Sequence, residues 1–203
     1  MADVTEKARQ PLGMGWGKPL VFVLCLLPLA AVVYGAVLGG LGPDPVKALI
    51  VMTGDWAIRA LLVVFSVSAL RSWSGWSRLL RFRRMVGLFA GFYASLHILV
   101  VATYLFAWDW IIVLEELSER PYIIAGFAAW LLMLPMVVTS NNYSVRRLGR
   151  RWRQLHRLMY PVMGLAWLHV VWQVRSSYLE ALIYGLLIVV LALPRLRRFQ
   201  LAR

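Results

Sequence analysis

The sequence predicts an all-α membrane protein, a six-transmembrane-helix bundle with both termini in the cytoplasm. Hydrophobic residues make up 61% of its 203 residues, whereas soluble domains contain about 45–50%. The mean hydropathy is +0.71, and the apolar residues gather in six stretches of roughly membrane-crossing length. The net charge of +13 comes largely from arginines in the short segments between these stretches. It therefore indicates membrane topology and lipid contact, and no nucleic-acid partner is expected.

Three parts are predicted along the chain. Residues 1–18 are polar and Gly-rich and form a cytoplasmic N-terminal segment, residues 19–194 form the six-helix domain, and residues 195–203 form a basic cytoplasmic tail. The first span runs from about Pro19 to Leu38. It resembles a signal peptide because a lysine precedes an apolar run, but the five spans that follow favour a retained helix.

The second span is expected at about Trp56 to Leu70, after a turn-rich segment, Gly39 to Pro45. It is slightly short of the roughly 20 residues that cross a bilayer. The span is therefore expected to begin earlier, near Leu49, or to end later, near Trp73. The apolar stretch Val46 to Met52 is too short to cross alone and is expected in the outer interface.

Prolines mark the boundaries of the later spans. Pro121 precedes the fourth span, where a proline in the first helical turn loses no hydrogen bond. Pro161 lies inside the fifth span and can kink it. An RSSY turn leads into the sixth span. Pro194 is expected to end the sixth span. The third to sixth spans are predicted at about Met85 to Ala107, Tyr122 to Thr139, Leu155 to Val174 and Leu179 to Leu193.

Charge predicts the orientation. Arginine-rich segments follow spans two and four and form the C-terminus, and Lys7, Arg9 and Lys18 add the N-terminus. With six spans, all four segments lie on one side of the membrane, which the positive-inside rule assigns to the cytoplasm. An acidic loop lies on the other side, between spans three and four, and contains Asp109, Glu115, Glu116 and Glu119.

The three histidines, His97, His156 and His169, all lie in or at the edge of apolar spans. An imidazole in hydrocarbon is costly, so its presence there suggests a function. The chain has no Cys-x-x-Cys-His run for covalent haem attachment, and its single cysteine, Cys25, cannot form an internal disulfide. The histidines therefore point first to non-covalently bound haem.

His97 and His169 are predicted to be the two axial ligands of a haem iron. They lie about 18 Å and about 21 Å from the cytoplasmic ends of spans three and five, at 1.5 Å per residue. Ala90 and Ala94 lie on the His97 face of span three and leave room for a flat macrocycle. The alternative is ordinary helix packing, in which small residues and a hydrogen-bonding histidine are also common.

His156 lies at the cytoplasmic mouth of span five, about 20 Å from His169. It is a candidate for a second haem or for electron entry, and an interfacial histidine near lipid headgroups is the equal alternative. A second haem would need a non-histidine ligand. Five nearby arginines are candidates for contacts to haem propionates or a flavin phosphate, with topology as their other role: Arg83, Arg84, Arg150, Arg151 and Arg153.

Four segments resemble the MsrQ (YedZ) family, the haem-binding membrane subunits of bacterial MsrPQ methionine-sulfoxide reductases. They are GGLGPDPVK after span one, RRMVGL with the later Leu96 and His97 in span three, ERPYI before span four, and LGRRWRQLHRLMY opening span five. The last of these segments, LGRRWRQLHRLMY, is the most specific part of the resemblance. The wider ferric-reductase and NADPH-oxidase transmembrane family carries histidine pairs thirteen or fourteen residues apart on two helices. Here only span five has such a pair, which leaves the second haem of that family open.

The resemblance implies an electron relay in the bacterial inner membrane rather than a substrate-reducing catalyst. MsrQ-like proteins bind haem b, and FMN is attributed to them. They take electrons from quinol or a cytosolic flavin reductase and pass them to MsrP, a periplasmic molybdopterin enzyme that repairs oxidised methionine. The matching histidines are His97, His156 and His169, and no FMN motif can be marked.

Two other functions stay open. One is a stand-alone quinol-linked cytochrome b or ferric reductase with the same haem. The other is a transporter of metal ions or protons, or an assembly factor. The separation of about 20 Å between His156 and His169 argues against one shared zinc or copper site.

Overall fold

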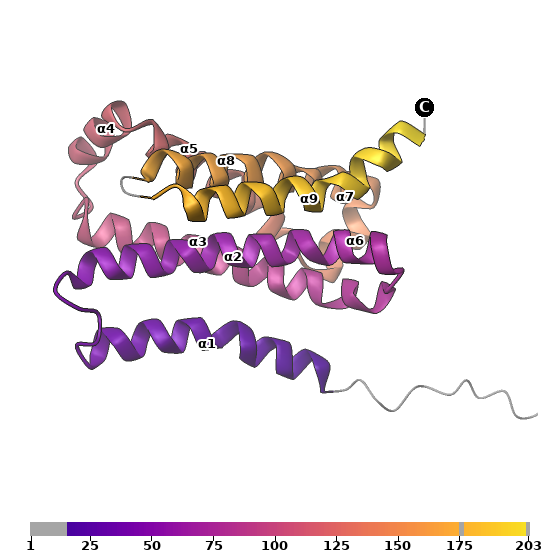
Figure 1. Cartoon of the computed structure of the whole chain (residues 1–203), viewed down its shortest axis with the longest axis horizontal. Helices are drawn as coiled ribbons and strands as arrows, with labels where there is room; N and C mark the ends of the chain where they lie inside the picture. Colours follow the sequence, from indigo (N-terminus) through magenta and orange to yellow (C-terminus); the bar gives the residue numbers. More distant parts are fainter. Residues whose placement is uncertain (1–15, 175–176, 202–203) are drawn as a thin grey trace, which may run out of the picture.

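The computed structural model describes residues 16–174 and 177–201, and all the regular structure in these residues is helical. The long helices α1, α2, α3, α5, α8 and α9 run along the molecule, and the shorter α4, α6 and α7 sit at its ends (Figure 1). The elements are α1 (Gly17–Val37), α2 (Pro45–Ser74), η1 (Ser77–Leu79), α3 (Leu80–Tyr104), α4 (Trp110–Glu119), α5 (Pro121–Val138), α6 (Asn142–Leu148), α7 (Arg150–Leu155), η2 (His156–Leu158), α8 (Met159–Gln173) and α9 (Leu179–Leu201).

Within residues 16–174 and 177–201, four segments are long and apolar enough to cross a membrane: α1, α2, η1 with α3, and α5. In α9 the apolar part is shorter, Leu179–Leu193, while α7, η2 and α8 follow one another without a break from Arg150 to Gln173. The predicted all-helical membrane class is therefore confirmed. The count of six crossings stays a prediction.

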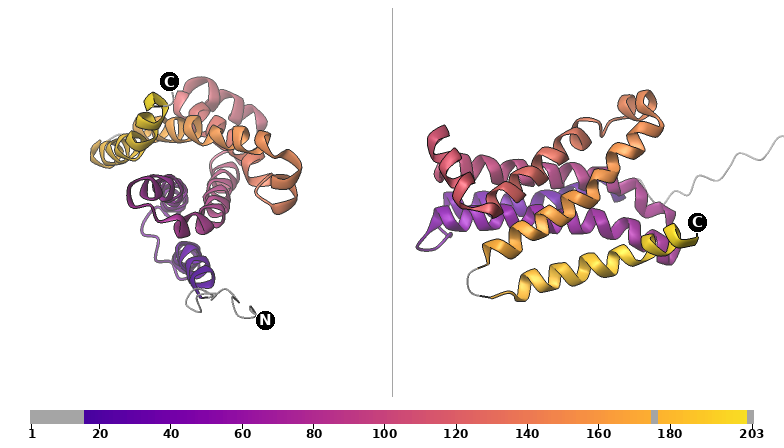
Figure 2. Two further views of the ribbon diagram at one scale, coloured as in Figure 1. Left: turned by 90° about the vertical axis from the view of Figure 1, so that its right-hand side faces the viewer. Right: turned by 90° about the horizontal axis from the view of Figure 1, so that it is seen from above.

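The bundle consists of two closely packed helix pairs. α2 packs mainly on α3, and α5 packs mainly on α8; contacts of α3 with α5 and of α2 with α8 join the pairs. The view along the bundle shows α1 at its rim (Figure 2). The core between the pairs is apolar and contains Leu61, Phe65, Ala90, Met133, Val162 and Met163.

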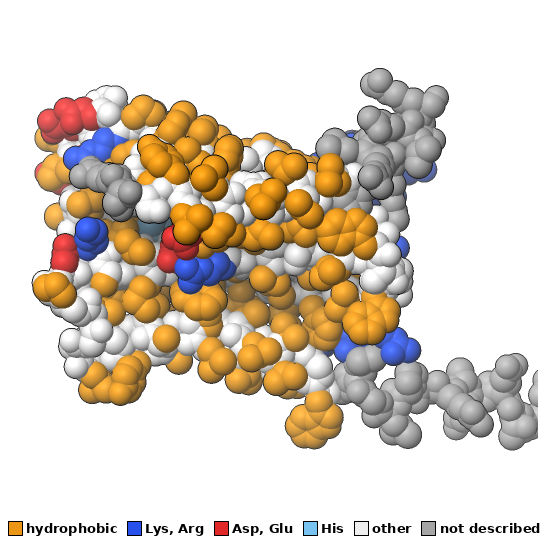
Figure 3. All heavy atoms as spheres, in the orientation of Figure 1, with side chains coloured by type: hydrophobic (Ala, Val, Ile, Leu, Met, Phe, Trp, Pro, Cys, Tyr) orange, Lys and Arg blue, Asp and Glu red, His pale blue; other side chains and the backbone are white. Residues whose placement is uncertain are grey.

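Large hydrophobic side chains cover the flank of the bundle (Figure 3). Leu20 on α1 is 60% exposed and Leu186 on α9 is 65% exposed. Such a surface is unfavourable in water and suits contact with lipid chains.

The stretch Val46–Met52 belongs to α2 and is continuous with the second span; its place in the outer interface stays a prediction. The Asp44 side chain accepts a hydrogen bond from the Lys47 amide at 3.0 Å, and Pro45 occupies the first helical turn. The helix therefore starts before the earliest predicted residue, Leu49. Its 30 residues span about 45 Å, well beyond a hydrocarbon core of about 30 Å.

The third span ends at Tyr104 rather than at Ala107. Ala107 and Trp108 have φ values of 47° and 60°, a left-handed conformation that an α-helix does not continue through. The acidic segment that follows contains α4 and is not simply a loop. Asp109 caps this helix by accepting a hydrogen bond from the Ile111 amide at 2.8 Å.

Prolines act differently in the two last spans. The 3₁₀ turn of η2 ends three residues before Pro161, as expected where a proline ring displaces the carbonyl four residues earlier. Pro194 does not end the sixth span, because α9 continues to Leu201. Membrane helices tolerate such a proline when the freed backbone groups find other partners. The predicted tail, residues 195–203, is therefore helical as far as it is described.

Charged segments separate to the two ends of the bundle. α4 lies at one end, and η1, α6 and α7 lie at the other, where the described chain also begins and ends (Figure 1). This arrangement agrees with the predicted grouping of arginine-rich segments. Which end faces the cytoplasm stays a prediction. Residues 1–15 and 175–176, which contain most of the predicted N-terminal segment and part of the RSSY turn, lie outside the described residues.

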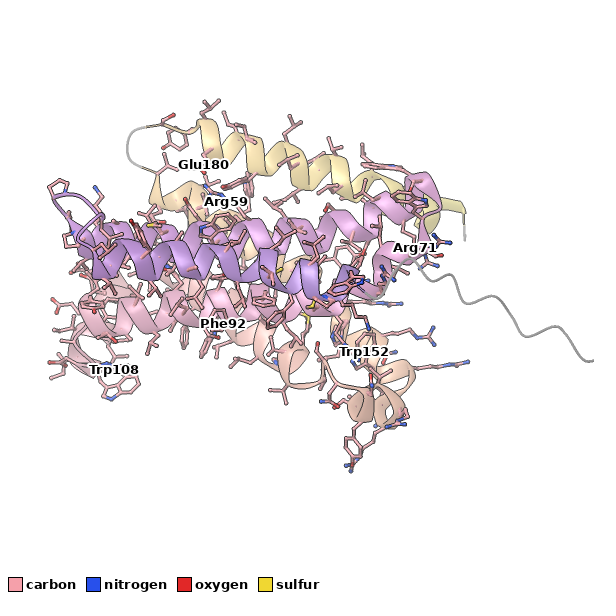
Figure 4. All side chains as sticks on the ribbon, turned by 90° about the horizontal axis from the view of Figure 1, so that it is seen from below. Arg59, Arg71, Phe92, Trp108, Trp152 and Glu180 are labelled. Atoms are coloured by element: carbon pink, nitrogen blue, oxygen red, sulfur yellow. The ribbon has the colours of Figure 1, made fainter. Side chains whose placement is uncertain are left out.

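One ionic network connects α2 with α9. Arg59 Nη2 lies 3.1 Å from both Asp55 Oδ2 and Glu180 Oε1. Arg59 Nε donates to the Tyr184 hydroxyl at 3.1 Å, and that hydroxyl donates to Glu180 Oε1 at 2.8 Å. Arg59 and Glu180 are neighbours on this flank (Figure 4). The network holds α9, which otherwise packs mainly through apolar contacts.

Glu180→Gln removes one charge from this network and should lower the thermal unfolding midpoint. We expect a shift of about 2–4 °C, which corresponds to about 1 kcal/mol in a chain of this size. Circular dichroism of the detergent-solubilised protein measures it. Glu115→Gln is the matched control, because among the described residues the Glu115 carboxylate forms no ion pair. Equal midpoints for the two variants would contradict a stabilising role of the network.

Candidate functional site

The structure brings His97 and His169 together in the interior of the bundle. Their ring centroids are 6.2 Å apart, and the ring planes are inclined by 79°. His97 comes from α3 and His169 from α8, so one imidazole belongs to each helix pair. The juxtaposition expected from their depths is present; their role as ligands stays a prediction.

Each imidazole is oriented by a backbone carbonyl of the partner helix. His97 Nδ1 lies 3.1 Å from the carbonyl oxygen of Ile50 on α2. His169 Nδ1 lies 2.6 Å from the carbonyl oxygen of Tyr122 on α5. A carbonyl oxygen can only accept, so Nδ1 carries the proton in both rings. The lone pair of each neutral ring is then on Nε2, the atom that can bind a metal.

This arrangement fits two axial ligands of one porphyrin iron. A metal–imidazole nitrogen bond is about 2 Å long and the ring centre lies roughly 1 Å further back, so rings on opposite sides of one metal have centres about 6 Å apart. The observed separation agrees with this. No group of three His, Cys, Asp or Glu that could hold a bare metal ion occurs within residues 16–174 and 177–201. Two imidazoles suit haem, whose macrocycle supplies the other four ligands.

Two glycines that the sequence analysis did not single out make room for the imidazoles. A Cβ on Gly54 would lie 3.2 Å from His97 Cε1. A Cβ on Gly126 would lie 2.6 Å from His169 Nδ1, closer than such atoms approach. The only sequence signal for them is a glycine inside an apolar span, which is also typical of ordinary helix contacts in membranes.

Thr53 is a further polar residue at the site that the sequence analysis did not identify. It is completely buried, with 0% of its surface exposed. Its Oγ1 lies 2.7 Å from the Leu49 carbonyl oxygen and 3.3 Å from His97 Nδ1. The His97 ring therefore has two polar neighbours on its Nδ1 side.

His156 is separate from this pair and lies toward the α7 end of the bundle. Its ring stacks on Trp152, with centroids 3.8 Å apart, and Nδ1 lies 3.0 Å from the Trp152 carbonyl oxygen. Nε2 lies 3.4 Å from Ser140 Oγ. Trp108 lies at one end of the molecule, and Trp152 lies toward the other (Figure 4).

His156 lines a cavity of about 260 Å³ between α2, α3, α5 and the start of the fifth span. Arg83 and Arg84 also line it, as does Ala90, which was expected to leave room for a macrocycle. Arg84 Nη1 donates to Asn142 Oδ1 at 2.6 Å. The other three candidate arginines do not line this cavity; they are exposed on α7, at positions Arg150, Arg151 and Arg153.

Known proteins resemble this chain over most of its length. The family model "Ferric reductase like transmembrane component" matches residues 53–167. The chain is 38% identical over 177 residues to the "Protein-methionine-sulfoxide reductase heme-binding subunit MsrQ" of Polaromonas naphthalenivorans, covering 86% of this chain and 81% of that protein. It is 41% identical over 180 residues to the protein of the same name from Xanthomonas euvesicatoria, covering 86% and 83%.

The chain belongs to the MsrQ (YedZ) family. Such identity over four fifths of both chains supports a shared fold. The matched range 53–167 contains Thr53, His97 and His156 and stops two residues before His169. No solved structure matches the chain.

Proposed function

We propose that this MsrQ-family chain is a haem b-containing electron-transfer subunit of the bacterial inner membrane. It receives electrons from quinol or a cytosolic flavin reductase and delivers them to a periplasmic molybdopterin methionine-sulfoxide reductase, MsrP, which repairs oxidised proteins. The observation that carries the proposal is the pair of imidazoles 6.2 Å apart, each with its Nδ1 proton held by a helix carbonyl. The names of the relatives support haem binding and the reductase role.

The protein's own residues bind and shield the site. His97 and His169 present Nε2 lone pairs from two helix pairs, and the surrounding apolar core excludes water. When bound, the haem supplies a one-electron carrier within the membrane. A hydrogen bond on Nδ1–H increases the donor strength of Nε2, so both ligands suit a stable low-spin iron.

A flavin is assigned no step in this proposal. FMN is attributed to the family, but among the described residues no structural feature marks a flavin site. The exposed arginines of α7 stay candidates for phosphate or propionate contacts. Arg83 and Arg84 have the stronger geometric case, because both face the cavity that His156 lines.

A second candidate function is a stand-alone quinol-linked cytochrome b or ferric reductase. The match to the ferric-reductase-like family over residues 53–167 favours it. The two functions share the haem and differ in the acceptor. Purified protein that reduces small acceptors rapidly but fails to reduce MsrP would favour this second function.

His97→Ala and His169→Ala should each abolish the low-spin haem spectrum, since each removes one of two axial ligands. The measurement is the visible absorption spectrum of the reduced, purified protein together with haem quantitation. A folded His97→Ala protein with the wild-type spectrum would exclude the ligand assignment. A wild-type protein that is folded and colourless would favour the transporter alternative instead.

His156→Ala should leave the spectrum of the His97–His169 haem intact, because the two sites lie in different parts of the bundle. A lower haem-to-protein ratio would assign His156 to a second haem. An unchanged ratio with slower reduction by quinol or flavin reductase would assign it to electron entry. If neither quantity changes, His156 has only an interfacial structural role.

The acidic helix α4 is proposed to contribute to docking of MsrP. Reversing charge with Glu115→Lys and Glu119→Lys should slow MsrP reduction, most strongly at low ionic strength, because surface electrostatics act mainly on association rates. Glu116 is left unchanged because it pairs with Arg120 at 2.8 Å. Reduction of the haem by the cytoplasmic donor serves as the internal control and should not change. If the charge-reversed variant reduced MsrP at the wild-type rate at every salt concentration, α4 would be excluded as the docking surface.

A further inference from the structure

Two five-residue segments on different helices hold the two histidines in the same way. The first is Ile50–Gly54 on α2, and the second is Tyr122–Gly126 on α5. In each, the carbonyl of the first residue lies against Nδ1 of the imidazole. In each, the fifth residue is a glycine whose missing side chain leaves space for that ring. We call these two stretches the cradle segments.

Helix geometry explains why the glycine stands four residues after the carbonyl. Side chains tilt toward the N-terminus of their helix, so a side chain at position i+4 lies over the carbonyl of residue i. An imidazole that reaches this carbonyl from a neighbouring helix occupies the same place. At Gly126 a Cβ would lie 2.6 Å from His169 Nδ1, and at Gly54 it would lie 3.3 Å from His97 Nδ1. The second cradle segment is therefore the tighter one.

The two cradle segments differ at their fourth residue. Thr53 occupies this position on α2, and Ala125 occupies it on α5. The shortest contact of Thr53 Oγ1, 2.7 Å to the Leu49 carbonyl oxygen, uses its single hydroxyl proton. A hydroxyl oxygen keeps lone pairs that can accept, and His97 Nδ1 lies 3.3 Å away. The His97 N–H thus has two acceptors, whereas His169 has the one carbonyl at 2.6 Å.

We propose that the cradle segments are the positioning elements of the haem site, and that Thr53 makes the His97 side of it electronically distinct. This inference rests on the proposed haem function. Gly54 and Gly126 admit each imidazole to its carbonyl and so fix the ring orientation. The Thr53 hydroxyl adds a second acceptor for His97 Nδ1–H, which makes His97 a stronger donor to iron and stabilises the oxidised state.

Thr53→Val tests the electronic part, because valine keeps the branched shape and loses the acceptor. The midpoint potential of the haem, measured by spectroelectrochemical titration, should shift to more positive values while haem content stays at the wild-type level. The low-spin electron paramagnetic resonance signal should shift with it. Thr53→Ser restores the hydroxyl and should return the potential toward the wild-type value. If Thr53→Val kept the wild-type midpoint potential and the wild-type resonance signal, the electronic role of the Thr53 hydroxyl would be overturned.

Gly126→Ala tests the steric part. It should lower haem occupancy or convert the low-spin signal to a high-spin one, and Gly54→Ala should do so less, since its Cβ meets the ring at a greater distance. Gly164→Ala on α8 is the matched control, because nothing lies within 4 Å of its added Cβ. Gly54→Ala keeps the test decisive if Gly126→Ala does not fold. Unchanged spectra in both folded cradle variants would overturn the positioning role.

Failure of this inference is distinguishable from failure of the proposed function. If the wild-type protein binds no haem, the function itself is wrong. If the wild-type protein shows a low-spin haem that depends on His97 and His169 while the glycine and threonine variants behave like wild type, only the cradle inference is wrong.

Discussion

The hydrogen bonds from the two imidazoles to helix carbonyls are the constraint on which the interior of this bundle depends. A helix carbonyl ordinarily accepts from the amide four residues later, so the Ile50 and Tyr122 carbonyls are shared with His97 and His169. Sharing requires close approach of the neighbouring helix, which explains why α2 packs tightly on α3 and α5 on α8. The two pairs then meet across the rings, and the site lies between them.

Polar groups inside the bundle are few, and those of the histidine site and of the Arg59 network have partners within the protein. The buried Ser68 Oγ on α2 is an exception and has no hydrogen-bond partner. The histidine site lies inside, between the pairs, and the network around Arg59 lies on the flank between α2 and α9. In the hydrocarbon core of a membrane, no water is available to form a hydrogen bond with an unpaired polar group. The arrangement therefore leaves an apolar surface for lipid, interrupted where the Arg59 network reaches it, and concentrates polarity where helices must be held in one orientation.

Much of the helical layout could be predicted because apolar runs and prolines are local signals. The depth match of His97 and His169 also followed from the rise of a helix alone. The start of α2 was missed because Val46–Met52 was read apart from the span that it continues, and α4 was missed because its charged residues resemble a loop. The cradle segments could not be predicted, since depth does not reveal which way a residue faces. Gly54 and Gly126 have meaning only once the partner helix is placed.

The same hydrogen bonds bear on whether the site moves electrons or protons. A proton relay needs groups that both accept and release protons in sequence, as chains of carboxylates and histidines do. Here the Nδ1 protons of His97 and His169 end on backbone carbonyls, which have no proton to pass on. The Thr53 hydroxyl likewise gives its proton to a carbonyl, that of Leu49. Each proton is therefore held in place, and the two Nε2 lone pairs remain for a metal. A site that holds its protons and offers its lone pairs is suited to ligating iron, and this favours electron transfer over proton transport.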